Sequence, residues 1–106
     1  MIDSLEDLKT ALGGLNIPIA YSHFKTATST PYLVYYVDGT DNFFADNKVW
    51  DKVNTIYIEL YTDKKDETLQ TSLETILNNN ELPYEITGEL FIDDENLYEV
   101  IYQIEL

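Results

Sequence analysis

One alternating stretch of sequence constrains the fold of this chain most. In residues 49–62, aliphatic side chains recur at every second position, with tyrosine and glutamate between them. This period of two is the pattern of a β-strand that buries one face in an apolar core. The face predicted to be buried carries Ile56, Ile58 and Leu60, and the opposite face carries Tyr57, Glu59 and Tyr61. The chain is therefore expected to contain a sheet whose second face is rich in tyrosine.

A second strand is predicted directly upstream. Residues 32–37 read YLVYYV and are apolar at both odd and even positions, so both faces of this strand need cover. Residues 32–38 and 49–62 can pair as a hairpin, with residues 39–48 as its loop. This loop is longer than a tight hairpin requires, which predicts a projecting segment with a role of its own.

Two amphipathic helices are predicted to cover the sheet. Residues 3–13 carry leucines at helical spacing, and a glycine pair ends that segment. Residues 62–79 contain the clearer helix, because apolar residues recur there at i, i+4, i+7 and i+8. The stripe consists of Leu69, Leu73, Ile76 and Leu77. Either Asp63 or Asp66 can cap the start of this helix.

The remaining segments complete an α-β-β-β-α-β-β order. An irregular edge strand is expected in residues 16–24, a polar loop in residues 25–31, and two closing strands after Pro83. The pattern predicts a single α+β domain over residues 1–106, with a mostly antiparallel or mixed sheet of four to five strands and two helices packed on one face. Two helical stripes cover only one face, so the other face is expected to meet a partner. A self-assembling ring or dimer is the simplest interpretation.

The charge balance excludes some classes of function. Twenty acidic residues face six lysines, the chain has no arginine, and the formal net charge is −14. Specific nucleic-acid binding and attraction to an anionic membrane are therefore not expected, since both need cations. The charge either keeps the protein soluble or repels DNA, and both interpretations stay open.

Targeting and redox features are sparse. The N-terminus lacks the basic start and apolar core of a signal peptide, and no apolar run approaches the ~20 residues that span a bilayer. The chain contains no cysteine, which excludes disulfides and fits a reducing compartment.

No residue pattern indicates catalysis or a cofactor. His23 has no obvious partner in the sequence, and the oxygens of Asp38, Asp41, Asn42 and Asp46 lack the spacing of a calcium loop. We therefore predict no catalytic, cofactor-binding or metal residues, and no enzyme. A hydrolase that uses two acids remains an alternative, and it would show as paired carboxylates with raised pKa values in a closed cleft.

The aromatic residues around the long loop are the main candidate site. Phe43, Phe44 and Trp50 lie in or beside a polar segment, where they either fold back into the core or anchor a neighbouring subunit. Together with Tyr57 and Tyr61 on the strand that follows, they form the predicted interface.

Four segments in a fixed order resemble a known family. They are PYLVYY (31–36), NFFADNKVW (42–50), IELYTDKKDETLQTSLETIL (58–77) and YEVIYQIEL (98–106). From about residue 17 onward the chain is similar to small structural proteins of tailed phages and prophages of Gram-positive bacteria.

The resemblance implies a tail completion or tail terminator protein of a long-tailed, non-contractile phage. Such subunits form hexameric rings that cap the tail tube and join it to the head connector, through which DNA passes. The implied partners are the tail-tube and head-connector proteins, and the implied location is the virion tail, or the host cytoplasm during assembly. Head-closure and head–tail joining proteins are alternatives within this class. An acidic inhibitor that mimics DNA is the alternative outside it.

Overall fold

The computed structural model describes residues 2–40, 43–45 and 48–106, and within residues 43–51 it describes the backbone path only. A five-stranded sheet has the strand order β1-β2-β5-β7-β6. Its strands are β1 (Ile19–Tyr21), β2 (Tyr32–Thr40), β5 (Asn54–Thr62), β6 (Glu85–Ile92) and β7 (Leu97–Glu105). β1 is parallel to β2, and the other neighbouring pairs are antiparallel. The predicted α+β class with a mixed sheet is confirmed.

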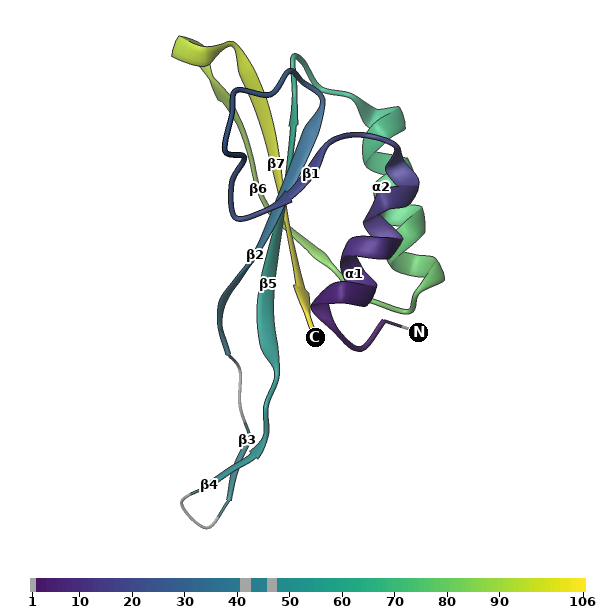
Figure 1. Cartoon of the computed structure of the whole chain (residues 1–106), viewed down its shortest axis with the longest axis vertical. Helices are drawn as coiled ribbons and strands as arrows, with labels where there is room; N and C mark the ends of the chain where they lie inside the picture. Colours follow the sequence, from purple (N-terminus) through teal and green to yellow (C-terminus); the bar gives the residue numbers. More distant parts are fainter. Residues whose placement is uncertain (1, 41–42, 46–47) are drawn as a thin grey trace.

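Both α-helices lie on one face of the sheet, as the sequence predicted (Figure 1). They are α1 (Leu5–Leu12) and α2 (Glu67–Asn79). Leu8, Leu12, Leu73 and Leu77 of these helices are fully buried against the strands. Neither helix is long and apolar enough to cross a membrane, and the same holds for every helix in the described part of the chain.

The start of α2 shows how local sequence fixes a helix. Asp66 is the N-cap, and its carboxylate Oδ1 accepts a hydrogen bond of 3.0 Å from the backbone N–H of Leu69. Of the two predicted caps, Asp66 therefore holds the helix start. Asp63 instead accepts a hydrogen bond from the Thr30 hydroxyl, which ties the β1–β2 connection to the end of β5.

The predicted long strand and its loop differ from the structure. The strand breaks at residues 52–53, because residues 48–51 form β4 (Lys48–Asp51), which pairs with β3 (Phe43–Ala45). Among the described residues, β3 and β4 pair with each other and with no strand of the main sheet. Pairing of β2 with β5 becomes irregular after Val37, and Gly39 adopts a positive φ of 92°. The hairpin therefore leaves the sheet and continues as a separate two-stranded unit.

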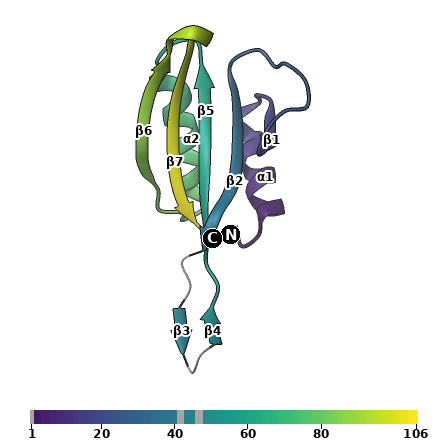
Figure 2. The same ribbon diagram turned by 90° about the vertical axis from the view of Figure 1, so that its left-hand side faces the viewer.

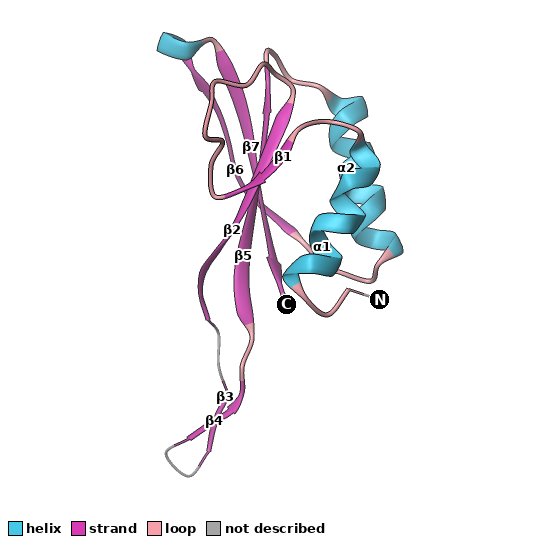
Figure 3. Ribbon diagram, viewed as in Figure 1, coloured by secondary structure: helices cyan, strands magenta, loops and turns pink. Residues whose placement is uncertain are grey.

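This unit, which we call the arm (β3 and β4), projects beyond one end of the sheet, away from both helices (Figures 1 and 3). The principal dimensions of the chain are 50 × 29 × 24 Å, and the arm lies along the longest of them.

The connection between β1 and β2 lies on the face of the sheet that the helices leave uncovered (Figure 1). It runs through residues 22–31, and its Phe24 ring packs edge-on against Tyr32 with ring centres 5.5 Å apart. The sequence analysis predicted a loop here, but not that the loop covers part of the second face. This face is thus partly covered by the chain itself.

Candidate functional site

The candidate site is the open face, which we define as the side of β2, β5 and β7 turned away from the helices. Along β5, Ile56, Ile58 and Leu60 are buried under the helices, while the alternate residues are only partly buried. Directly paired residues of neighbouring strands share a face. The open face therefore carries Tyr32, Val34, Tyr36, Tyr57, Glu59, Tyr61, Glu99 and Ile101.

Tyrosine rings on the open face form cross-strand pairs. Tyr32 on β2 stacks on Tyr61 of β5 with ring centres 4.9 Å apart. Tyr36 and Tyr57 form a second, tilted pair at 5.9 Å. Such pairs stabilise a sheet and also leave polarisable surface at its exposed side.

Glu59 is held at the centre of these rings by two hydroxyl groups. The Tyr36 hydroxyl donates a hydrogen bond of 2.7 Å to its Oε2, and the Tyr61 hydroxyl donates one of 2.8 Å to its Oε1. Burial, followed by the hydrogen bonds to acidic groups, raises the pKa of both tyrosines well above its ordinary value. Both hydroxyls therefore remain protonated donors at neutral pH.

Glu99 of β7 lies beside this group and is 7% exposed. Burial raises the pKa of the Glu99 carboxyl, the nearby Tyr61 hydroxyl lowers it, and the neighbouring Glu59 carboxylate raises it further. Glu99 therefore holds its proton more readily than an isolated glutamate does.

Paired carboxyl groups, one of them with a raised pKa, are one feature expected of an acid-pair hydrolase. However, both Glu59 oxygens already accept hydrogen bonds from tyrosines, and Glu99 is buried between strands. The adjoining hollow lies between the open face and residues 22–31 and is open to solvent, with the exposed His23 at its rim. The geometry thus holds the two acids within the sheet, and this pair presents no free carboxylates to a substrate.

The structure separates the predicted interface residues into two places. Tyr57 and Tyr61 lie half-buried on the open face. Phe43 and Phe44 belong to β3 and Trp50 to β4, so all three lie on the arm, and their side chains are outside the described part. Contact of any of these residues with a partner stays a prediction.

Most of the oxygen-bearing cluster at residues 38–46 lies outside the described residues. Asp41, Asn42 and Asp46 lie outside the described residues, and Asp38 is exposed on β2. In the described part of the chain, no three acidic or histidine side chains gather in a way that could hold a metal ion.

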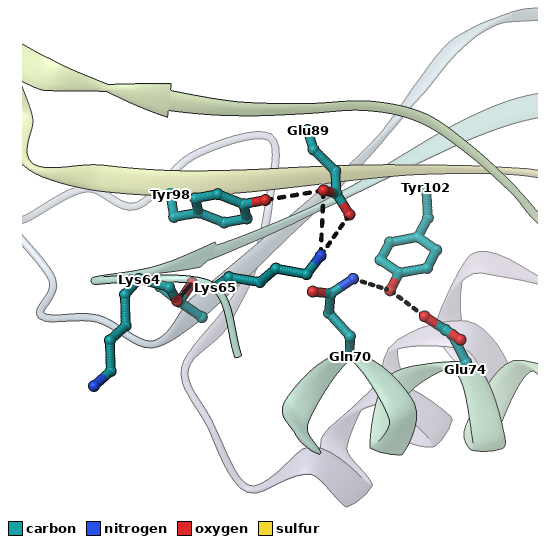
Figure 4. Close-up of polar contacts among 8 residues, drawn as sticks. Lys64, Lys65, Gln70, Glu74, Glu89, Tyr98 and Tyr102 are labelled. Carbon is teal, nitrogen blue, oxygen red and sulfur yellow. Dashed lines mark hydrogen bonds and ion pairs between the residues drawn. The ribbon is translucent and has the colours of Figure 1, made fainter. Parts of the chain in front are cut away.

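A second polar cluster fastens α2 to the sheet (Figure 4). The Tyr102 hydroxyl donates a hydrogen bond of 2.6 Å to Glu74 and accepts one of 3.4 Å from the Gln70 amide. Nearby, Lys65 forms an ion pair with Glu89 at 3.0 Å. These hydrogen bonds tie the polar groups of α2 to the sheet, except for the buried Oε1 of Gln70, which has no hydrogen-bond partner among the described residues.

The exposed apolar residues of β6 were not among the predicted site residues. Ile86 and Leu90 are an even number of positions apart, so an unbroken strand would put them on one side. Pairing instead shifts between Ile86 and Gly88, which puts Ile86 opposite Tyr102 on the helix side and Leu90 opposite Glu99 on the open face. Gly88 is the residue in the sequence that could have indicated this shift, since a glycine within a strand pattern marks a bulge.

No protein-family model matches this chain, and no match was found among curated proteins. Its function is therefore argued from the surfaces described above and from the resemblance noted in the sequence.

Proposed function

We propose that this protein is a non-enzymatic phage virion structural protein. In this proposal it is the tail terminator or tail completion subunit, which forms a ring at the head-proximal end of the tail and joins the tail to the head connector. The ring is expected to be a hexamer, to contact the tail-tube and head-connector proteins, and to reside in the virion tail after assembly in the host cytoplasm.

The projecting arm is the observation that carries the proposal. It consists of strands of three and four residues that pair only with each other in the described part of the chain. An isolated two-stranded hairpin is marginally stable in water. The sequence nevertheless gives this arm Phe43, Phe44 and Trp50, which are residue types that anchor interfaces. A neighbouring subunit or the tail tube is the partner that would order and cover such an arm.

The charge of the chain supports the same proposal. A formal charge of −14 disfavours adsorption of DNA, as a channel for DNA requires. A ring whose lumen carries part of this charge would let the genome slide through without sticking.

The direct test is electron microscopy of virions made without this protein. Tails of uncontrolled length would support termination. Tails of normal length beside heads that leak DNA would instead indicate a head-closure or head–tail joining protein.

A second candidate, an acidic inhibitor that mimics DNA, is favoured only by the negative charge. Light scattering over a concentration series, combined with a DNA-competition assay against a basic partner, separates the two candidates. A protein that stays monomeric and displaces DNA from that partner would support the mimic.

A further inference from the structure

The most exposed large apolar side chains of the described residues lie on the two edge strands of the sheet. Tyr21 on β1 is 48% exposed, and on β6 Ile86 is 44%, Leu90 is 42% and Phe91 is 47% exposed. The strand order puts β1 at one edge and β6 at the other (Figure 2). Exposed apolar surface that could contact another chain therefore lies along both edges of the sheet as well as on its open face.

Both edges also offer unpaired backbone groups. Within the described structure, β6 pairs only with β7, and β1 pairs only with β2. An exposed edge strand with apolar side chains is a template for pairing with a strand of another chain. β6 has eight residues, so it is not one of the very short edge strands by which proteins limit such pairing.

The two edges differ sharply in charge. Residues 17–37, which form β1, the connection over the open face and the first part of β2, contain no acidic residue and carry Lys25 and His23. Residues 81–99, which form β6, its turn and the start of β7, contain no lysine and seven acids. These acids are Glu81, Glu85, Glu89, Asp93, Asp94, Glu95 and Glu99.

This contrast selects one arrangement of two copies. Contact between two β6 edges would bring two acid-rich segments together, which like charge opposes. Contact between two β1 edges would leave both β6 edges uncovered. The first turn of α1, with Glu6 and Asp7, lies in the helix layer behind β1 (Figure 2). The strand and the loop themselves contain no acids, although Asp63 accepts a hydrogen bond from Thr30 at the end of the loop, and Glu59 and Glu95 line the hollow beside it.

We propose that the β6 edge of one copy adds to the β1 edge and the 22–31 loop of a second copy, head to tail. In the sheet, β1 and β6 run in opposite directions, because β1 and β7 are parallel and β6 is antiparallel to β7. A copy rotated about an axis along the strands therefore continues the sheet with an antiparallel pair. Such a heterologous contact closes into a ring when the rotation closes. The inference deepens the proposed function, on which the ring itself rests, by naming the two surfaces that join.

Because the chain contains no cysteine, single-cysteine variants test the contact cleanly. Ser22→Cys marks the loop at the β1 edge and Thr87→Cys marks β6, and both positions are exposed. The variants are treated at high protein concentration with a short bis-maleimide, since paired strands lie about 5 Å apart. Covalent dimers are expected when the two variants are mixed, and not when either is treated alone.

Two controls define the result. Thr75→Cys, on the exposed side of α2, should not cross-link to Ser22→Cys. If Thr87→Cys links only to itself, the contact is symmetric and the head-to-tail proposal is wrong. If no mixture cross-links at the highest soluble concentration, a second copy does not occupy the edge and the proposal is also wrong.

A charge exchange tests the electrostatic argument. Lys25→Glu should lower the yield of the mixed dimer about two- to fivefold, as expected for loss of an exposed ionic attraction. Glu85→Lys on the β6 partner should restore the yield, and thermal unfolding of both variants should stay unchanged. If neither substitution changes the yield of the mixed dimer, the proposed charge complementarity is wrong.

The cross-linking results do not depend on where the protein lies in the virion. Mixed dimers together with tails of normal length in virions lacking the protein would keep the edge contact and reject tail termination. Tails of uncontrolled length without mixed dimers would reject the edge contact alone.

Discussion

The two faces of the sheet are made by the same strands but are built differently. On the helix side, Ile56, Ile58 and Leu77 are fully buried and packed as a continuous apolar core. On the open face, tyrosines surround an acid pair, and residues 22–31 cover only part of the surface. The helix side thus carries the apolar burial that stabilises the fold, while the open face, the edges and the arm are the surfaces that the proposed assembly would use.

The largest effect on stability is expected on the helix side. Leu77 of α2 is fully buried, so Leu77→Ala should lower the free energy of unfolding by about 2–5 kcal/mol through lost burial and a cavity. Chemical denaturation measures this change. Thr75→Ala, on the exposed side of the same helix, is the matched control and should change stability little. A loss at position 77 no greater than that of the control would remove the distinction between the faces.

The polar cluster at the rim of the helix side should have the next largest effect. Tyr102→Phe removes the donor to Glu74 and the acceptor for Gln70 within a buried site, and it should cost about 1–3 kcal/mol. Tyr84→Phe removes a single, longer hydrogen bond of 3.1 Å to Glu74 and should cost less. Equal losses for the two variants would show that burial of the Tyr102 hydroxyl, with its two hydrogen bonds, adds nothing to the free energy of unfolding.

The acid pair predicts a smaller change of the opposite sign. The pKa of Glu99 is raised in the folded protein, so the folded state holds this proton more tightly than the unfolded state. Protonated Glu99 therefore contributes its full stabilisation below the ordinary glutamate pKa of about 4.3. This stabilisation is lost as the pH rises through the pKa that Glu99 has in the folded protein. Glu99→Gln should flatten this decline and raise stability at neutral pH.

A pH series of thermal unfolding curves tests the acid pair. Glu105→Gln, at an exposed position on the same strand, is the control and should leave the pH profile unchanged. A Glu99→Gln variant that is less stable than the parent at neutral pH would contradict the proposed cause of the shift.

Sequence reasoning reached the elements but not all of their pairings. The leucine stripe and the cap of α2 depend on neighbours within a few residues, so the stripe was predicted correctly and Asp66 was one of the two predicted caps. The meeting of Glu59 with Glu99 depends on the register of β5 with β7, and nothing in the spacing of twenty acids selects that pair. A projecting segment was predicted, but its own strands β3 and β4 were not, because residues 49–53 continue the apolar and polar pattern of β5 locally.

The arm tests the central claim most directly, because the claim is that the body folds by itself and the arm serves assembly. The double variant Phe44→Ser/Trp50→Ser should keep the unfolding curve of the parent to within about 1 kcal/mol, because the claim assigns these residues to assembly and not to the folded body. The same variant, supplied to virions that lack the parent protein, should fail to restore tails of uniform length. A variant that unfolds, or one that folds and restores normal tails, would contradict the account.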